Sequence, residues 1–251
     1  MATISLVTGG SRGLGRNTAL SIARNGGDVI LTWRGDEAGA EAAVAEIAAL
    51  GRRAVALQLD TGDVSSFEDF ADRVRAALAA TWQRERFDHL VNNAGHGYSA
   101  AIADTTEAAF DRLVDVHLKG PFFLTRALLP LLADGGCIVN LSSGLTRFAN
   151  PGYAAYAAAK SAVETLTRYM AAEFGPRGIR VNTVAPGAIA TDFNGGAVRD
   201  NAEINRRLAD ATALGRVGVP DDIGPMIASL LGDANRWVNA QRIEVSGGQS
   251  I

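Results

Sequence analysis

The segment Thr8-Gly9-Gly10-Ser11-Arg12-Gly13-Leu14-Gly15 follows a short apolar run and opens a helical pattern. Glycines at these positions suit a sharp strand-to-helix turn, because a pyrophosphate can then approach the backbone N–H groups at the helix start. The spacing is GxxxGxG and no Gly-Lys-Ser/Thr follows, so a nucleoside triphosphate loop is disfavoured. The turn predicts a dinucleotide site, with a purely structural turn as the alternative.

Outward from this turn, short apolar runs alternate with longer helical patterns. This alternation predicts right-handed βαβ units and an α/β fold, a doubly wound parallel sheet of Rossmann type with helices on both faces. Its ligands should bind at the carboxyl ends of the strands. The expected strands are ISLVTG, DVILTW, AVALQLD, HLVNNAG, CIVNLSS, RVNTVAPG and RIEVSGG, and the expected helices cover about 13–25, 37–50, 66–80, 107–132 and 153–174.

Neither a composition shift nor a repeat divides the 251 residues, so we expect a single domain over 1–251. The segment 192–216 interrupts the regular alternation and begins with the glycine-containing FNGG. Such an insertion after a strand end favours a lid over the substrate. An ordinary pair of surface helices is the alternative.

The overall charge argues against polyanionic partners. A formal net charge of -3 and a pI near 5.7 indicate neither nucleic-acid binding nor attachment to an anionic membrane. No apolar run approaches the ~18 residues of a membrane span, and no signal segment opens the chain. We therefore expect a cytoplasmic protein that acts on a small molecule, with Cys137 as a buried structural residue and no metal site.

The basic residues are mostly arginines. Of the 24 lysines and arginines, only Lys119 and Lys160 are lysines. A lysine ammonium is a compact charge that can exchange its proton, whereas an arginine stays protonated in a planar fork. Each lysine is therefore a candidate for a role that arginine cannot take.

The end of the second expected strand indicates which nicotinamide cofactor binds. NAD-binding proteins usually place an acidic residue there for the ribose 2′-hydroxyl, but this chain reads Leu31-Thr32-Trp33-Arg34. Arg12 and Arg34, one from each of two neighbouring turns, would suit a 2′-phosphate. NADP(H) is therefore preferred over NAD(H), although Asp36 and Glu37 follow closely.

Five motifs occur in a characteristic order and spacing: TGGSRGLG, Asn92-Asn93-Ala94-Gly95, Ser143, Tyr156-x-x-x-Lys160 and Pro186-Gly187. With them the sequence resembles the short-chain dehydrogenase/reductase family over essentially its whole length. The closest pattern is the single-domain branch that contains 3-oxoacyl-acyl-carrier-protein reductases and ketone reductases. The resemblance implies a homotetramer built through the helices that flank the fifth strand.

The same resemblance implies a catalytic group. Tyr156 would protonate the substrate carbonyl as hydride arrives from the B face of the nicotinamide. Lys160 lies one helical turn later and would lower the pKa of the phenol. Ser143, thirteen residues before Tyr156, would hydrogen-bond the carbonyl, with Ser142 as its rival. Tyr153 is about two turns from the lysine and is expected to line the substrate side.

The family pattern also implies the cofactor contacts. Asp60 would receive the adenine amino group, and the segment from Pro186 to Thr191 would bind the nicotinamide, although Thr191 could equally cap a helix. The expected cofactor-binding residues are Gly9, Ser11, Arg12, Gly13, Leu14, Gly15, Arg34, Asp60, Asn92, Ala94, Gly95, Tyr156, Lys160, Pro186, Gly187, Ile189 and Thr191.

His117 departs from the family pattern, which commonly has asparagine there as part of a water-linked proton relay to the active-site lysine. Pro121 has no N–H, so the carbonyl of His117 lacks its usual helical partner and can take a water. His117 could carry a proton itself near neutral pH. Alternatively, its ring only fills the space of the asparagine.

The sequence thus predicts an NADPH-dependent reductase of a ketone or 3-oxo group, acting on a small carbonyl or alcohol substrate. A reductase specific for acyl-carrier thioesters is one alternative: Arg177 matches one carrier-binding position, but Leu132-Ala133-Asp134 places an acid at the other. A non-catalytic NADP(H)-binding sensor or scaffold is the second alternative, because a fold alone does not establish a function.

Overall fold

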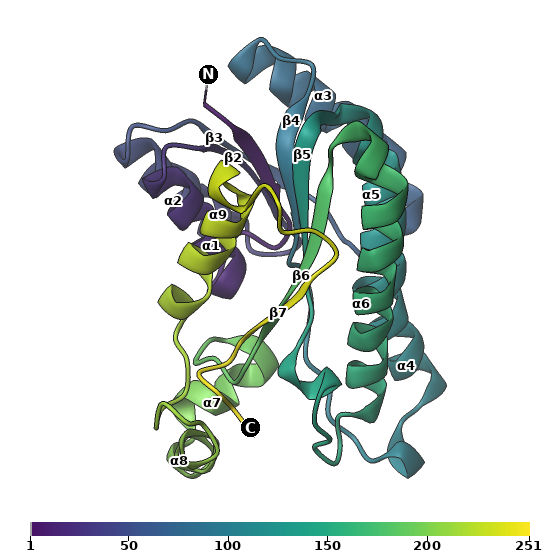
Figure 1. Cartoon of the computed structure of the whole chain (residues 1–251), viewed down its shortest axis with the longest axis vertical. Coiled ribbons are helices and arrows are strands. Elements are labelled where there is room, and N and C mark those ends of the chain that lie inside the picture. Colours follow the sequence, from purple (N-terminus) through teal and green to yellow (C-terminus); the bar gives the residue numbers. More distant parts are fainter. Residues whose placement is uncertain (1) are drawn as a thin grey trace.

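Seven parallel strands form one sheet in the order β3-β2-β1-β4-β5-β6-β7 in the computed structural model, which describes residues 2–251 (Figure 1). The strand order reverses between β1 and β4, so the connections that leave these two strands diverge and open a crevice at their carboxyl ends. The strands are β1 (Ile4–Val7), β2 (Asp28–Trp33), β3 (Ala54–Gln58), β4 (Phe87–Asn92), β5 (Leu132–Leu141), β6 (Arg180–Pro186) and β7 (Arg242–Val245).

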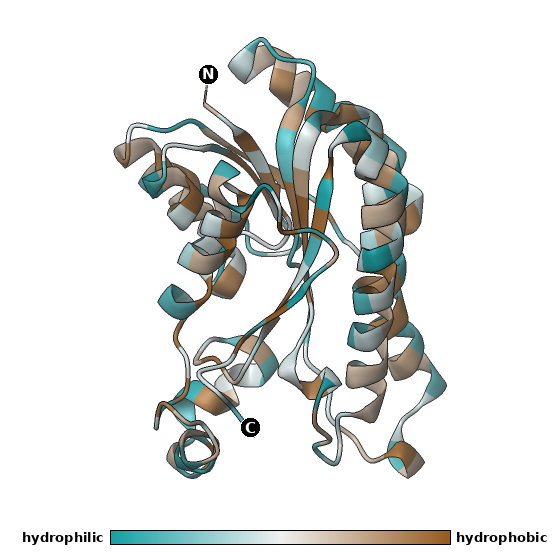
Figure 2. Ribbon diagram, in the orientation of Figure 1, coloured by the Kyte–Doolittle hydropathy of each residue, from teal (hydrophilic) through white to brown (hydrophobic). Residues whose placement is uncertain are grey.

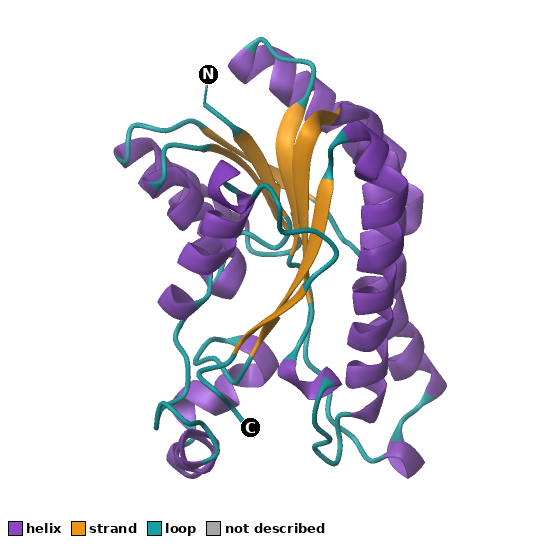
Figure 3. Ribbon diagram, in the orientation of Figure 1, coloured by secondary structure: helices purple, strands orange, loops and turns teal. Residues whose placement is uncertain are grey.

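Helices cover both faces of the sheet (Figures 1 and 3). Each face has its own apolar core, and the hydrophobic colour in Figure 2 runs along the strands between the two helical layers. The layers confirm the expected doubly wound α/β fold in a single domain. One layer holds α1 (Gly13–Arg24), α2 (Glu37–Ala49) and α9 (Gly224–Leu231), and the other holds α3 (Phe67–Trp82), α4 (Glu107–Val114), α5 (Gly120–Leu128) and α6 (Ala154–Phe174).

The helix expected over 107–132 is interrupted. A π-helical turn spans Asp115–Lys119, in which the Gly120 N–H donates to the carbonyl of Asp115. Pro121 follows directly and cannot donate a backbone hydrogen bond, so the helix widens before it. The helix then ends in a 3₁₀ turn at Leu129–Leu131, and β5 begins at Leu132, five residues before the expected Cys137.

The segment after β6 folds into short helices rather than an open loop: a 3₁₀ turn at Phe193–Gly196, α7 (Ala197–Asp200) and α8 (Ala202–Asp210). Beyond it, residues 211–214 pair with the C-terminal residues 247–250, through bonds such as Ser250 N–H to the Ala211 carbonyl at 2.8 Å. In Figure 1 these helices lie beside the C-terminus, below the carboxyl ends of the strands.

The buried carboxylate of Asp28, at the amino-terminal end of β2, links this strand to the residues before β3 and to the end of α3. It accepts hydrogen bonds from the Arg53 backbone N–H at 2.9 Å and from Trp82 Nε1 at 2.8 Å, and it pairs with Arg52 at 2.7 Å. Burial alone would raise the pKa of this carboxyl, but these hydrogen bonds and the Arg52 charge outweigh it, and the net pKa is lowered.

Asp28→Asn should therefore lower the free energy of unfolding at pH 7 by about 1–3 kcal/mol. Because the folded-state pKa lies below the unfolded one, the wild type holds this advantage above the unfolded pKa of about 4 and loses it as the pH falls through the folded value. Urea unfolding at several pH values measures both effects. The exposed pair Arg73–Asp69 supplies the control, Asp69→Asn, and an equal loss in both variants would contradict the account.

Candidate active site

A cavity of about 860 Å³ opens at the carboxyl ends of the strands. Its walls come from segments far apart in the sequence, and they include every predicted site residue except Asn92. The predicted residues that line it are Gly9, Ser11, Arg12, Gly13, Leu14, Gly15, Arg34, Asp60, Ala94, Gly95, His117, Ser143, Tyr156, Lys160, Pro186, Gly187, Ile189 and Thr191.

The glycine turn forms one end of this cavity, at the N-terminus of α1. Gly9 and Gly13 have φ angles of +68° and +55°, which favour glycine. A Cβ on Gly15 would lie 2.1 Å from the Gly9 carbonyl oxygen, so no side chain fits there. The turn thus presents free backbone at a helix N-terminus, and this arrangement fits a pyrophosphate.

Two arginines flank the glycine turn. Arg12 and Arg34 are exposed at the cavity, and within residues 2–251 their guanidinium groups have no hydrogen bond or ion pair. Asp36, one of the two nearby acidic residues that could favour NAD(H) binding, also lines the cavity. Its carboxylate, however, caps α2 by accepting from the Gly39 N–H at 3.0 Å. The positive charge at this end is therefore available to an anionic ligand.

Asn92 does not lie where the sequence predicts. Its amide donates to Asn140 Oδ1 at 2.8 Å and to Thr125 Oγ1 at 3.2 Å, inside the sheet layer. Its neighbour Asn93 lines the cavity instead and donates to the Thr8 carbonyl at 2.8 Å. Because side chains alternate along a strand, the sequence indicates that Asn92 and Asn93 point to opposite faces of the sheet. It does not indicate which of the two side chains lines the cavity.

Tyr156 and Lys160 both project from α6 and are buried. Ser143 lies near enough to Tyr156 to lower the pKa of its phenol, whereas the hydroxyl of Ser142 donates to Glu164 at 2.6 Å. This arrangement favours Ser143 over its rival as the partner of the tyrosine. Lys160 Nζ donates to the Leu141 carbonyl at 2.7 Å and lies 5.9 Å from the centre of the Tyr156 ring.

The expected lowering of the phenol pKa is not found in this structure. Burial raises the pKa of Tyr156 well above its ordinary value of 10, and the neighbouring Ser143 offsets only part of this. Burial also lowers the pKa of Lys160 to about 8. Near neutral pH the phenol is therefore protonated, and the lysine is mostly charged. Lys119, in contrast, is an exposed residue paired with Asp115, a role that arginine could also fill.

His117 packs edge-on against Tyr156, with ring centres 5.2 Å apart. Its Nε2 lies 2.8 Å from the carbonyl oxygen of His96 and 3.4 Å from the His96 backbone nitrogen. Because the carbonyl of the shorter contact can only accept, we assign the proton of the neutral ring to Nε2. Nδ1 is then an acceptor, buried and without a partner among residues 2–251. His96 also lines the cavity and is half-buried.

The protonation state of His117 bears on its proposed relay role. Burial, together with the charge of Lys160, lowers the pKa of His117 well below its usual 6.5. The ring is therefore neutral near pH 7, and this disfavours proton carriage by an imidazolium ion. Its Nε2 contact with the His96 carbonyl links it to the loop that follows Asn93.

The other end of the cavity is mainly apolar and aromatic. The 192–216 segment contributes several side chains, of which Phe193 has its ring centre 6.1 Å from that of Tyr156. The sequence predicts only residues 192–216 and Tyr153 as parts of the substrate end, because the other contacts join distant parts of the chain. The apolar and aromatic residues that line this end include Tyr98, Leu145, Phe148, Tyr153, Phe193, Val198, Ile204 and Leu208.

Comparisons with known proteins agree with this geometry. Residues 9–250 match the family model described as enoyl-(acyl carrier protein) reductase. An uncharacterized oxidoreductase of Methylorubrum extorquens is 37% identical over 245 residues, which cover 98% of this chain and 96% of that protein.

Two solved ketoreductases have closely similar folds. The promiscuous reductase LugOII, which catalyses keto-reduction at C1 during lugdunomycin biosynthesis, has a TM-score of 0.94 at 37% identity, over 99% of this chain and 98% of that one. The angucycline C-6 ketoreductase LanV, solved with bound NADP, has a TM-score of 0.94 at 32% identity, over 99% and 95%. The chain belongs to the short-chain dehydrogenase/reductase family of oxidoreductases.

Proposed function

We propose that this protein is an NADPH-dependent reductase that converts a ketone to an alcohol, with Tyr156 as the general acid. One observation carries the proposal: the buried phenol of Tyr156, with Ser143 and Lys160 beside it, lies in the same cavity as the glycine turn at the N-terminus of α1. The bound cofactor would supply the hydride. The B face is the expected face of transfer.

Protein groups would handle the proton and the charge. The raised pKa keeps the phenol protonated, so Tyr156 can donate to the carbonyl oxygen as negative charge develops there. Ser143 would hold that oxygen by a hydrogen bond. The tyrosinate that remains would lie beside the Lys160 ammonium, which is mostly protonated below its pKa of about 8.

The preference for NADP(H) rests on the two arginines. The guanidinium groups of Arg12 and Arg34 have no partner among the described residues and both residues line the cavity, while Asp36 is engaged as a helix cap. Guanidinium groups in this position suit a 2′-phosphate. The NADP bound to LanV supports the same choice.

The proposed substrate is a bulky, largely apolar ketone that fits the aromatic end of the cavity. The ketoreductase activities named for LugOII and LanV support this class. A carrier-bound thioester is less well supported, because Arg177 is already engaged with Asp134 at 2.7 Å and with two backbone carbonyls. We further propose that residues 192–216 act as the lid.

Two further expectations remain proposals. A homotetramer through α5 and α6 is supported by exposed aromatic side chains on these helices, Phe122 at 46% and Tyr169 at 65%. His117 is proposed to position the loop that carries His96, with Nδ1 free to accept a hydrogen bond from a water.

No helix among residues 2–251 is long and apolar enough to cross a membrane.

Tyr156→Phe should reduce kcat at least ~100-fold, because it removes the proton donor and leaves the ring in place. NADPH affinity, measured by fluorescence titration, should change little. Tyr169→Phe, at an exposed position of the same helix outside the cavity, is the matched control and should retain the turnover. Retained turnover in Tyr156→Phe would contradict the mechanism, and NADPH binding with no turnover of any ketone by the wild type would favour the sensor.

Arg34→Ala should raise the KM for NADPH about 10- to 100-fold, the range expected from losing charge-assisted hydrogen bonds to a phosphate. The KM for NADH should stay nearly constant. Initial rates with both cofactors measure the difference, and Arg24→Ala, at the far end of α1, serves as the control. Equal effects on NADPH and NADH would show that Arg34 does not read the 2′-phosphate.

His117→Asn should keep kcat within about threefold, since an asparagine amide can also donate to the His96 carbonyl, whereas His117→Leu should lose about tenfold. The pH dependence of kcat should be the same in wild type and His117→Asn between about pH 6 and 8, because the histidine is neutral throughout. A wild-type limb near pH 6.5 that disappears in His117→Asn would restore the proton-carrier hypothesis.

A further inference from the structure

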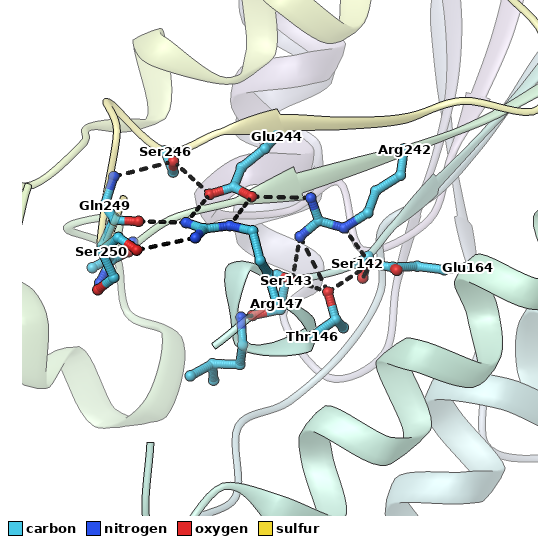
Figure 4. A network of polar contacts seen from close by, with 12 residues as sticks. Ser142, Ser143, Thr146, Arg147, Glu164, Arg242, Glu244, Ser246, Gln249 and Ser250 are labelled. Atoms are coloured by element: carbon cyan, nitrogen blue, oxygen red, sulfur yellow. Dashed lines mark hydrogen bonds and ion pairs between the residues drawn. The ribbon is translucent and has the colours of Figure 1, made fainter. Parts of the chain in front are cut away.

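Four charged residues form a continuous chain of ion pairs beside the active site: Glu164, Arg242, Glu244 and Arg147 (Figure 4). They come from α6, from β7 and from the loop that follows Ser143. Arg242 pairs with Glu164 at 2.8 Å and with Glu244 at 3.0 Å, and Glu244 pairs in turn with Arg147 at 2.8 Å. We refer to these four residues as the clamp.

The inner end of the clamp holds the loop that carries Ser143. Glu164 Oε1 accepts from the hydroxyls of Ser142 and Thr146 at 2.6 and 2.7 Å. Arg242 Nη2 donates to the Ser143 carbonyl at 3.3 Å and to Thr146 Oγ1 at 3.1 Å. Both sides of the serine are thus fixed by charged groups.

The outer end of the clamp holds the C-terminus. Arg147 makes a two-pronged pair with Glu244, with both N–O distances at 2.8 Å, and it donates to the carbonyls of Gln249 and Ser250 at 2.5 and 3.0 Å. Its Nε, Nη1 and Nη2 all donate, a fork that a lysine cannot reproduce. The hydrogen bonds, that from Arg147 first, lower the pKa of Glu244 to about 2, although burial alone would raise it. The Arg147–Glu244 pair therefore stays ionised.

The held segment is itself a wall of the cavity. Gln249 and Ser250 line it, and the Gln249 side chain accepts from the Ala188 N–H at 2.9 Å. The same segment pairs with residues 211–214 at the base of the lid, for example Ala213 N–H with the Gly248 carbonyl at 3.2 Å. One arginine therefore connects the Ser143 loop to the lid through the C-terminal residues.

We propose that Arg147 is a positioning residue that latches the C-terminal segment 247–251 to the Ser143 loop and thereby sets the substrate end of the cavity. The expected effect on substrate kinetics rests on the proposed function. Removal of the Arg147 side chain should leave the glycine turn, Arg12 and Arg34 in place. Its loss should therefore affect the ketone far more than NADPH.

The test compares Arg147→Gln and Arg147→Lys with a matched control, Arg84→Gln. Arg84 also makes a two-pronged pair at 2.8 Å, with Asp88, near the amino end of β4 and away from the cavity. The readouts are KM and kcat for a bulky ketone, the NADPH dissociation constant, and hydrogen–deuterium exchange of the amides of residues 211–214 and 247–250.

Arg147→Gln should raise the ketone KM about tenfold and speed exchange in both segments, with the NADPH dissociation constant changed less than about twofold. Arg147→Lys should recover only part of the loss, and Arg84→Gln should match the wild type. Unchanged exchange in Arg147→Gln would overturn the latch, as would an equal weakening of NADPH binding. If the wild type reduces no ketone, the proposed function fails, while faster exchange in Arg147→Gln still supports the latch.

Discussion

The close approach of Gly15 to the Gly9 carbonyl is the constraint on which the site depends. A Cβ on Gly15 would lie 2.1 Å from that oxygen and 2.4 Å from the Asn93 amide nitrogen. Only because this position has no side chain can the start of α1 pack against the ends of β1 and β4, where the strand order reverses. The helix N-terminus then faces the cavity, and Arg12 and Arg34 flank it. The geometry of the proposed cofactor end of the site depends on this close approach.

The proposed catalytic end of the cavity depends on burial. Burial pushes two pKa values in opposite directions, raising that of Tyr156 and lowering that of Lys160 to about 8. Both effects favour the uncharged forms, so the ground state carries a protonated phenol ready to donate. When that proton leaves, the Lys160 ammonium would stabilise the negative charge of the tyrosinate. The α6 spacing of four residues makes this pairing possible.

Local spacing explains what the sequence could predict. The glycine turn and Tyr156-x-x-x-Lys160 depend on neighbours within one turn or one helix, and the strand–helix alternation was enough for the doubly wound sheet. The choice between Asn92 and Asn93 depended instead on the register of β4 with β5, where Asn92 faces Asn140. The Arg147–Glu244 pair joins residues 97 positions apart, and no motif marks it. The effect of burial on Tyr156 likewise requires the packed structure.

Transfer of deuterium from NADPH labelled at the pro-S (B-face) position of C4 tests the central claim most directly. With a bulky aromatic ketone as substrate, mass spectrometry should find the label on the carbinol carbon of the alcohol and unlabelled NADP⁺ as the other product. Label retained in NADP⁺ would contradict B-face hydride transfer. Loss of the label from both the alcohol and NADP⁺ would contradict direct hydride transfer in this cavity.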